Sequence, residues 1–509
     1  MLAVVQSFGR IGIEGYPMRV EVDVRDGMPQ MDVVGLPDAS VRESRERVRT
    51  AMKNSGYPFP TAGITINLAP ADIKKEGPWY DLPMALGILA ASGHIALEAL
   101  RGVMVLGALS LDGSVSAVTG ALPMLLKARE MGVRRALLPE QNAQECAALS
   151  GIELIPVKTL RQAADCLTGA ETVTPLRCQE YQTEDVAVDP GMDMSRIRGQ
   201  FAARRALEIA AAGGHNLLLI GTAGSGKTML ARCLPGILPR MTEQEALETT
   251  VIHSVTDGFS GGLMKQRPFS APHHTTSAAA LIGGGRNALP GEISKAHNGV
   301  LFLDELPEYP RTVLEALRQP MEDGEVTVSR VNARCVYPAK FQLVCAMNPC
   351  PCGNYGSRTK TCRCTPHEVQ RYLSRISGPL LDRIDMVVEM DAVPPEEVFG
   401  DAAPAEDSAS IRARVEKTRS VQNARYAGNS YTCNARIPSG ELERICAMTP
   451  QAKSLMLMCM KNLGLSMRAY TRVLRVARTI ADMEGSAVVQ EDHIAEAASY
   501  RGTNEKYWK

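Results

Sequence analysis

The chain has 509 residues, of which 45% are hydrophobic and 22% are charged, as is usual for globular proteins. The 56 basic residues balance the 56 acidic ones, which excludes a strong overall attraction to a polyanion or a membrane surface. At roughly 150 residues per domain, the length predicts about three domains.

The sequence contains no stretch of about 20 apolar residues, so we expect no transmembrane helix and no membrane partner. Residues Met1–Gly15 lack the basic segment and long apolar run of a secretory signal, so we expect a cytoplasmic protein. In that compartment most of the 13 cysteines are expected to be reduced.

Residues 1–175 have the pattern of a mixed α/β domain. Met18–Asp23 alternates polar and apolar side chains, as an exposed strand does. Ser40–Lys53 has the composition of a charged helix, and Leu82–Ala91 that of an apolar helix. A polar segment without clear periodicity follows, and we interpret residues 176–195 as a linker.

A second α/β unit is expected over residues 196–391, and it contains a phosphate-binding pattern. The pattern GxxxxGK[ST] is fitted by Gly221, Thr222, Ala223, Gly224, Ser225, Gly226, Lys227 and Thr228. A buried-strand run precedes it and a helix pattern follows it, which argues against a chance glycine-rich turn. Glycines let successive N–H groups face phosphates. Lys227 would reach the β- and γ-phosphates of ATP, and Thr228 would hold Mg²⁺.

Two further strands carry polar residues at their ends. Val300–Glu305 is an apolar run ending in two carboxylates, of which Asp304 would assist Mg²⁺ binding and Glu305 would polarise the attacking water. Phe341–Met347 is a buried-strand run that ends at Asn348, where a polar γ-phosphate sensor is expected. The alternative for Asn348 is a turn residue before a proline.

Between these strands, Glu325–Tyr337 alternates and turns near Asn332, so it is predicted to be a β-hairpin. In the ring motors that this chain resembles, such a hairpin faces the central pore, where Arg330 and Arg334 at its tip would contact phosphates. An ordinary exposed hairpin is the alternative. His273 and His274 lie earlier and are interpreted as part of a polar loop, because adjacent side chains on a strand point to opposite faces.

Four cysteines gather within a short segment that has few large apolar residues. Cys350, Cys352, Cys362 and Cys364 form two CxC pairs. Four thiolates suit tetrahedral Zn²⁺, and a loop without a core of its own gains from a metal staple. His367 is a spare ligand, and the alternative is a loop of reduced cysteines or a redox-labile pair.

Arg383 follows the sensor strand and is the candidate for an arginine finger acting on a neighbour's ATP, with Arg375 as a rival. A finger supplied in trans implies a ring of identical chains, commonly a hexamer. An ion pair with Asp382 or Asp385 is the alternative for Arg383.

Residues 392–410 are acidic and rich in proline and alanine, which indicates a second linker, and residues 411–509 have a helical pattern. Within Ser466–Met483 one helix face carries four arginines, which are Arg468, Arg472, Arg475 and Arg478. One arginine of this face is a candidate second sensor of the γ-phosphate, and the others are expected to form a solvated face or a polyanion contact. On the residues alone, the solvated face is favoured.

Several long segments resemble one family, the YifB/ComM family in the magnesium-chelatase branch of AAA+ proteins. These segments are Val34–Arg49, Asn67–Leu86, Arg267–Ser277, Pro290–Glu305, Met347–Gly353, Ser377–Asp385 and Ser466–Ala481. The resemblance implies an α/β fold class with a Lon-protease-like N-terminal domain, an AAA+ P-loop NTPase core and a helical C-terminal lid. It also implies an insertion in the second core helix, near Thr249–Leu289. The family's sensors map onto Asn348 and Arg468, and its finger onto Arg383.

The N-terminal domain departs from active Lon-type proteases. Where these carry a nucleophilic serine after Gly-Pro, this chain has Trp79, Tyr80 and Asp81 after Pro78. The stretch that matches the lysine turn ends at Leu122. Without a nucleophile and its base, we expect no peptidase activity at this site.

The resemblance implies a hexameric ATPase that moves along single-stranded or branched DNA, as in branch migration during natural transformation. One alternative is the motor subunit of a chelatase that inserts Mg²⁺ into a porphyrin. Another is a protein remodeller or scaffold. All three share phosphoryl transfer from ATP to water.

Overall fold

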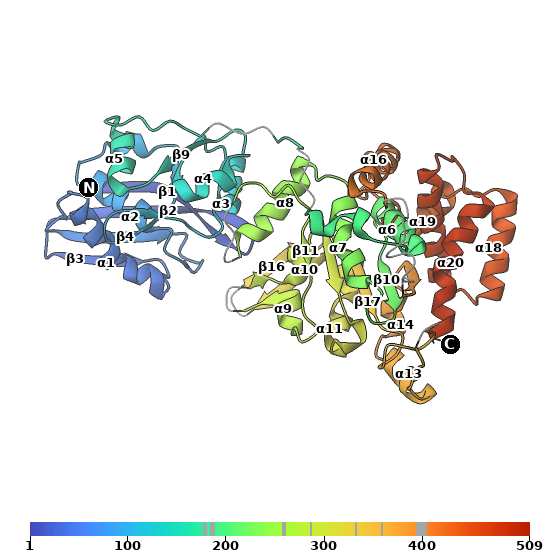
Figure 1. Cartoon of the computed structure of the whole chain (residues 1–509). Coiled ribbons are helices and arrows are strands. Elements are labelled where there is room, and N and C mark those ends of the chain that lie inside the picture. The colour runs from blue at the N-terminus through green and yellow to red at the C-terminus, as the bar shows by residue number, and fades with distance from the viewer. Residues whose placement is uncertain are drawn as a thin grey trace.

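The protein is described by a computed structural model in which three parts follow one another along an elongated molecule (Figure 1). The structure describes residues 1–176, 181–183, 189–256, 261–285, 288–330, 333–357, 360–392 and 405–508. None of the helices in these ranges is long and apolar enough to cross a membrane.

The N-terminal lobe is built on a mixed seven-stranded sheet with helices packed against it (Figure 1). In sheet order the strands are β3 (Gln30–Val34), β4 (Gly63–Ala69), β2 (Glu14–Arg25), β1 (Leu2–Ile11), β5 (Val103–Val105), β8 (Arg135–Pro139) and β9 (Glu153–Val157). A small pair, β6 (Ala108–Leu109) and β7 (Val115–Ser116), lies outside this sheet. The helices are α1 (Ala39–Asn54), α2 (Asp81–Ala91), α3 (Ala121–Glu130), α4 (Glu140–Cys146) and α5 (Leu160–Thr168).

The predicted elements of this lobe are confirmed. Met18–Asp23 lies within β2, where Met18, Val20 and Val22 are buried between less buried residues. Such alternation places one strand face on the core. The charged helix is α1, which Asp38 caps by accepting a hydrogen bond from the Val41 N–H, 2.8 Å away. The apolar helix is α2, which is buried throughout.

The central part is a parallel five-stranded sheet with helices on both faces. Its order is β11 (Phe269–Ser270), β14 (Val300–Leu303), β17 (Gln342–Met347), β10 (Leu217–Gly221) and β18 (Met386–Met390). Its helices include α6 (Phe201–Gly213), α7 (Lys227–Ile237), α8 (Glu243–Ser254), α11 (Arg311–Ala316), α12 (Arg318–Asp323), α13 (Pro366–Leu373) and α14 (Gly378–Leu381). Parallel strands that are covered on both faces must be apolar along their length. This is why the apolar runs of β10, β14 and β17 were recognisable in the sequence.

The expected helix insertion is narrower than Thr249–Leu289. Phe269 and Ser270 pair in parallel with Val300 and Leu301, so β11 belongs to the core sheet and is not inserted. The element that interrupts a helix is the hairpin of β12 (Gly283–Gly284) and β13 (Leu289–Pro290). It lies between α9 (Ala278–Ile282) and α10 (Glu292–Lys295). A strand of two residues leaves no periodicity in the sequence, which explains the wrong bounds.

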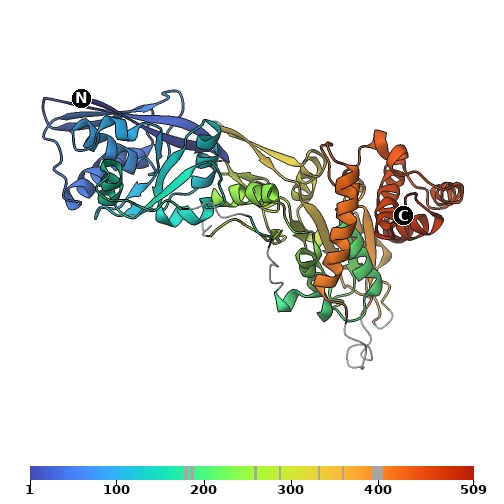
Figure 2. The ribbon, with the colours of Figure 1, turned by 90° about the horizontal axis from the view of Figure 1, so that it is seen from above.

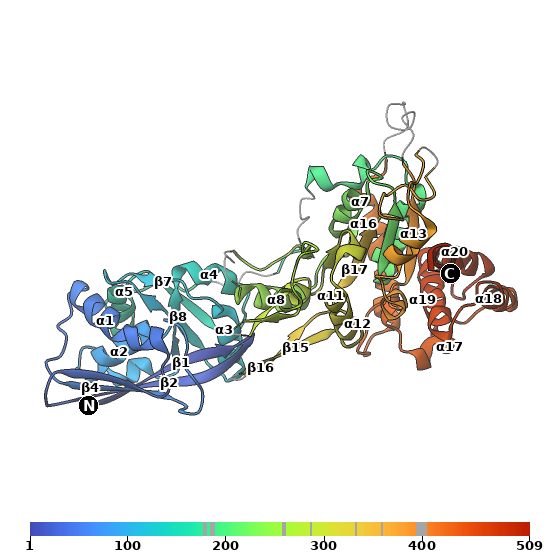
Figure 3. The same ribbon diagram turned by 90° about the horizontal axis from the view of Figure 1, so that it is seen from below.

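The predicted hairpin is confirmed as β15 (Glu325–Arg330) and β16 (Ala333–Pro338), while Asn332 and the Arg330 side chain lie outside the described residues. It reaches from the central part toward the end of β1 and β2 (Figures 2 and 3). A Cβ on Gly12, in the turn between those strands, would lie 2.6 Å from Tyr337 Oη. The turn of the N-terminal lobe therefore touches the side of the hairpin.

The C-terminal part is helical, as the pattern predicts. Its helices are α16 (Ser408–Arg425), α17 (Leu442–Ile445), α18 (Pro450–Asn462), α19 (Met467–Met483) and α20 (Glu491–Trp508).

Short 3-10 turns occur in all three parts, at Leu97–Leu100, Pro190–Met192, Met194–Arg196, Leu306–Glu308, Asn434–Arg436 and Ser439–Glu441. The helix α16 begins inside the predicted linker 392–410, of which residues 393–404 lie outside the described ranges.

The arginines of α19 do not form the solvated face that the sequence suggested. Arg478 is 1% exposed and donates to the carbonyls of Ser486 and Ala487, and Arg475 donates to Ile437 O. Arg468, in contrast, has a 72% exposed side chain. A guanidinium can be buried when its N–H groups are satisfied by carbonyls and carboxylates, and a helical wheel carries no information about such partners.

Candidate nucleotide site

The glycine-rich loop lies between the carboxyl end of β10 and the start of α7. Gly224 and Gly226 have φ values of +81° and +89°, in the left-handed region that favours glycine. A Cβ on Gly221 would lie 2.4 Å from the Met390 carbonyl oxygen of the neighbouring strand. These glycines let the loop curl tightly around the N-terminus of α7, where free N–H groups favour an anion.

Lys227 is held at the centre of this loop. Its Nζ donates to Gly221 O at 2.8 Å, to Thr222 O at 2.9 Å and to Asn348 Oδ1 at 3.2 Å. The residue is 9% exposed, and this burial lowers the pKa of its ammonium group. All these partners are neutral oxygens, so the charge has no bonded carboxylate among the described residues. Such a site fits an incoming phosphate.

Thr228 and Asp304 meet beside Lys227. Thr228 Oγ1 donates to Asp304 Oδ2 at 2.6 Å, and the other Asp304 oxygen accepts from the Glu305 N–H at 2.9 Å. A hydroxyl and a carboxylate at this separation are oxygen ligands of the kind that Mg²⁺ prefers. The residues present therefore fit a magnesium ion bound together with a nucleotide.

Glu305 lies on the solvent side of this cluster. Its side chain is 55% exposed, and its Oε2 lies 3.3 Å from His274 Nδ1. The His273 and His274 rings are 4.0 Å apart. Sequence reasoning placed His274 in a polar loop but missed its contact with Glu305, because the two residues are separated in the chain and no local pattern joins them.

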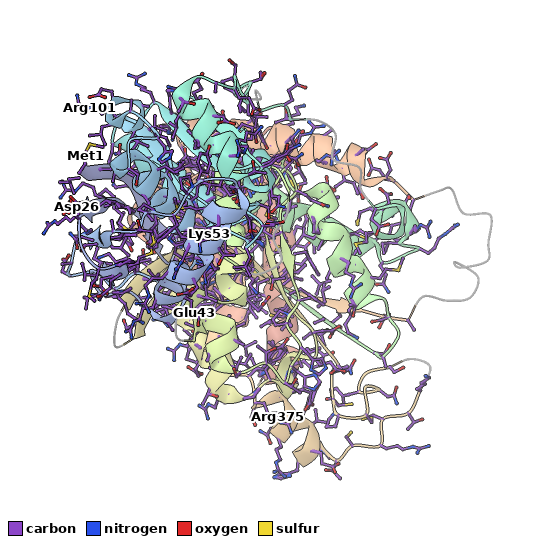
Figure 4. All side chains as sticks on the ribbon, turned by 90° about the vertical axis from the view of Figure 1, so that its left-hand side faces the viewer. Met1, Asp26, Glu43, Lys53, Arg101 and Arg375 are labelled. Carbon is purple, nitrogen blue, oxygen red and sulfur yellow. The ribbon has the colours of Figure 1, made fainter. Side chains whose placement is uncertain are left out.

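The candidate fingers are both engaged within their own chain. Arg383 is 10% exposed at its side chain, pairs with Glu322 and donates to Pro379 O at 2.7 Å. Arg375 is 52% exposed and pairs with Glu308 at 2.8 Å. It lies at the edge of the molecule, away from the labelled residues of the N-terminal lobe (Figure 4). Exposure therefore favours Arg375, and the choice of Arg383 stays a prediction.

Arg468, the candidate second sensor, lies in the first turn of α19. Its guanidinium is 3.8 Å from Asp382 Oδ2. Within the described ranges, no hydrogen bond or ion pair joins Arg468 to Lys227 or Thr228. The structure therefore leaves Arg468 exposed next to the segment that carries Arg383, and its role stays a prediction.

A buried polar network that sequence reasoning missed joins the core sheet to α19. Asp385 pairs with Arg472 and accepts from the Asn216 N–H at 2.9 Å. Burial would raise the pKa of Asp385, but Arg472 and His215 hold it below its usual value. His215 Nε2 lies 2.8 Å from Thr479 Oγ1. These bonds fix the helix that carries Arg468 against the strand that precedes the glycine-rich loop.

The four clustered cysteines come together in space. The Sγ atoms of Cys350, Cys352 and Cys362 are 3.4–3.7 Å apart, and Cys364 completes a group whose ligand atoms all lie within 4.8 Å of one another. Bonds of about 2.3 Å to one zinc would place tetrahedral sulfurs at similar separations. Backbone N–H groups lower the pKa of Cys352 to about 6. His367 does not belong to this group.

The cysteine loop lies against the glycine-rich loop. A Cβ on Gly353 would be 3.7 Å from Ala223 N and 3.8 Å from Asn348 Cγ. Cys350 follows Asn348 by two residues and is fully buried. Anchoring the four thiols would therefore fix the position of the candidate sensor.

In the N-terminal lobe, the segment that would carry a protease nucleophile is filled differently. Tyr80 and Leu122 are both fully buried. Asp81 is also fully buried and accepts from Arg47 Nε at 2.8 Å and from the Leu109 N–H at 3.3 Å. A carboxylate paired in this way is a structural group, since its charge is already satisfied.

The sequence matches known families along most of its length. Residues 193–398 match the family described as magnesium chelatase, subunit ChlI, residues 20–142 match subunit ChlI of Mg-chelatase, and residues 405–501 match the C-terminal part of subunit ChlI. The chain is 43% identical over 504 residues to competence protein ComM of Haemophilus influenzae, covering 98% of this chain and 97% of that protein. It is 42% identical over 501 residues to protein YifB of Escherichia coli, with the same coverage. A stretch of 146 residues, 27% of this chain and 26% of the other, is 30% identical to Lon protease 2 of Bacillus subtilis.

Proposed function

The chain belongs to the YifB/ComM family of magnesium-chelatase-like AAA+ ATPases, and from this premise we propose that it is an ATP-hydrolysing ring motor that acts on DNA. Its work would be branch migration or strand separation during recombination or natural transformation. The observation that carries the ATPase part is the neutral cage around the buried Lys227 ammonium, beside the Thr228–Asp304 pair.

Each side chain of this cage has a proposed role. Lys227 would exchange its bonds to Gly221 O and Thr222 O for the β- and γ-phosphates of ATP. Thr228 and Asp304 would hold Mg²⁺, which supplies charge neutralisation to the phosphates. Glu305 would polarise the attacking water, and Asn348, already 3.2 Å from Lys227 Nζ, would sense the γ-phosphate.

The proposal of a ring depends on an arginine finger that acts on the ATP of a neighbouring chain. Arg383 would have to leave Glu322 to reach a neighbour's γ-phosphate, whereas Arg375 would have to leave Glu308. Arg468, exposed at the start of α19, would contact the γ-phosphate once nucleotide is bound. We propose a homo-oligomer, commonly a hexamer, in which each site is completed by the next chain.

Zinc is proposed as a staple for the cysteine loop. Cys350, Cys352, Cys362 and Cys364 offer the closed four-thiolate set of a structural site, without the open position that catalysis needs. The ion would hold Asn348 and the glycine-rich loop in register.

The N-terminal lobe is proposed to be Lon-protease-like in fold and inactive as a peptidase. The buried Tyr80 and the paired Asp81 support the lack of a nucleophile. The lobe would scaffold the ring or guide DNA.

Action on DNA is supported by two observations. The relative at 43% identity is named a competence protein. The hairpin β15–β16, with Arg334 exposed near its tip, offers a basic element that would face a polymer in a ring pore.

The test is ATP hydrolysis by the purified chain without DNA, with single-stranded DNA and with a four-way junction. Lys227→Ala should abolish turnover, while the exposed Lys53→Ala on the N-terminal lobe should match the wild type. Stimulation by the junction that is lost in Lys227→Ala is the expected result. Turnover insensitive to every DNA would contradict the proposal and direct attention to a protein partner or to porphyrin metallation.

A further inference from the structure

A second polar cleft, of about 380 Å³, opens at the edge of the core sheet opposite the nucleotide site. Gly214, Asn298 and Phe341 line it, and each of them lies just before the amino end of β10, β14 or β17. The glycine-rich loop follows the carboxyl end of β10. The cleft is therefore separate from the ATP site.

Basic side chains dominate the lining of this cleft. Five are present, Arg240, Arg267, Lys340, Arg419 and Arg436, against two acidic ones, Glu245 and Glu248. The whole chain has equal numbers of basic and acidic residues, so the excess is a local feature. We call this set of five basic residues and the space between them the basic cleft.

Part of this charge is already neutralised. Arg267 lies 2.9 Å from Glu245 Oε2 and donates to Asn298 O at 2.7 Å. Arg240 lies 3.4 Å from Glu416. These two arginines have protein partners and help to shape the wall of the cleft.

The other three basic residues are not neutralised. Within the described ranges, the side chains of Lys340 and Arg436 make no hydrogen bond or ion pair. A Cβ on Gly324 would lie 3.4 Å from both Lys340 Cγ and the Arg436 guanidinium, so the two side chains are neighbours. Arg419 donates one N–H to Ala211 O at 3.2 Å, and its buried Nε has no partner among the described residues. Neighbouring cations without counter-charges create a site for an anion.

The basic cleft continues into an adjoining hollow. That hollow shares Arg240 and Arg267 with the cleft and adds Lys265 and Arg412 to its lining. Three unneutralised cations lining one cleft of about 380 Å³ suit a ligand with several phosphates in a row better than a single ion.

The uncharged lining indicates how such a ligand would be held. Tyr431 and Phe341 are 6% and 8% exposed, so neither offers an open ring on which a base could stack. Asn423, Ser430 and Thr432 add hydrogen-bonding groups. Contacts of this kind are made to phosphates and sugars and carry no sequence information.

We propose that the basic cleft binds the phosphate backbone of a nucleic-acid strand, without reading its bases, through Lys340, Arg419 and Arg436. The polymer part of this proposal rests on the proposed action on DNA. A free oligophosphate has the same chemistry as the backbone, and the experiment separates the two sources.

The experiment measures binding of a fluorescent single-stranded oligonucleotide to the full chain by anisotropy, over a series of salt concentrations. The variant is Lys340→Gln with Arg436→Gln, and the matched control is Lys53→Gln with Arg101→Gln, two exposed positions on the N-terminal lobe (Figure 4). Each phosphate contact to a single strand contributes a slope of about 0.7 in log K against log salt, so the variant should flatten the slope by about 1.4. Its affinity should fall by about tenfold or more, while melting temperature and DNA-free ATP hydrolysis stay at the control's values.

The possible outcomes separate the two proposals. If the wild type binds the oligonucleotide and the variant binds it with the same affinity and slope, the basic cleft is refuted and the action on DNA stands. If the wild type binds only tripolyphosphate, and this binding survives in Lys227→Ala but is lost in the cleft variant, the cleft holds a free oligophosphate and the action on DNA fails. If the wild type binds neither of these probes nor a four-way junction, both proposals are overturned.

Discussion

Lys227 shows at the scale of single residues how a short sequence motif becomes a chemical site. The glycines around it are needed for their backbone angles, and its ammonium is stripped of water and faced with neutral oxygens. Loop, strand and helix are contiguous in the chain, so the motif could be recognised without the fold. His274 beside Glu305, and Asp385 beside Arg472, are separated in sequence and become neighbours only when the sheet assembles.

Glu145 in the N-terminal lobe makes stability depend on pH. It is 6% exposed, and burial raises its pKa from 4.5 to about 7 although Asn142 donates to it at 3.0 Å. The folded state then binds more protons than the unfolded state between these two values, so stability falls as pH rises from 4.5 to about 7. At about 1.4 kcal/mol for each pKa unit, the full loss is about 3 kcal/mol.

The neutral substitution Glu145→Gln should remove this dependence. As pH rises from 4.5 to 8, the melting temperature of the wild type should therefore fall relative to that of Glu145→Gln. Melting followed by circular dichroism over this range checks it. A difference that stays constant with pH would show that the buried carboxyl titrates as an ordinary one. The exposed Glu130→Gln is the matched control.

At the scale of elements, α19 is fixed by one buried carboxylate. Asp482 accepts from Arg425 at 2.5 Å and 2.8 Å, from Arg478 Nε at 3.1 Å and from Asn434 Nδ2 at 2.8 Å. Asp482→Ala would leave two guanidiniums without their counter-charge. We expect a loss of about 3–5 kcal/mol, seen as a lower first melting transition.

Glu484→Ala is the control for that change, because Glu484 has a 54% exposed side chain and pairs with His493 at 3.0 Å. Because the carboxylate of this pair is largely exposed although His493 is buried, its loss should cost less than the loss of the buried Asp482, so this variant should melt closer to the wild type. Equal effects of Asp482→Ala and Glu484→Ala would refute the role assigned to the buried network.

The cysteine loop gives a second prediction at this scale. Protein purified without chelators should contain stoichiometric zinc, and Cys352→Ser with Cys362→Ser should lose it. Because the loop lies against Ala223 and Asn348, the variant should also hydrolyse ATP more slowly. Elemental analysis and a turnover assay measure both. Cys459→Ser, outside the cluster, should keep the metal. Metal-free wild type would end the zinc proposal.

The elements that the sequence predicted well are those with a strong local period. The β15–β16 hairpin and the buried strands β10, β14 and β17 carry clear alternation or continuous apolar runs. The two-residue strand β11 carries neither, so part of the core was taken for an insertion. The expectation of a solvated arginine face on α19 was wrong, because Arg478 is buried through its bonds to carbonyls of the loop that follows the helix.

At the scale of the whole molecule, the β15–β16 hairpin connects the central part with the N-terminal lobe. Ile13 and the Gly12 turn of the N-terminal lobe contact its Cys335 and Tyr337. Its second strand continues into β17, whose last residue precedes Asn348. The hairpin therefore links the N-terminal lobe to the strand that ends at the candidate γ-phosphate sensor. The sequence could not show this link because Gly12 and Tyr337 lie far apart in the chain.

The most direct test of the account is the ATP-dependent conversion of a labelled four-way junction into duplex products. The wild type should convert the junction, while Glu305→Gln should bind the junction and ATP but convert about 100-fold or more slowly, since loss of a general base costs a factor of that order. Glu130→Gln, an exposed carboxylate on the N-terminal lobe, is the matched control. Two results would contradict the account. In one, Glu305→Gln converts the junction as fast as the wild type does. In the other, the wild type hydrolyses ATP but leaves the junction intact.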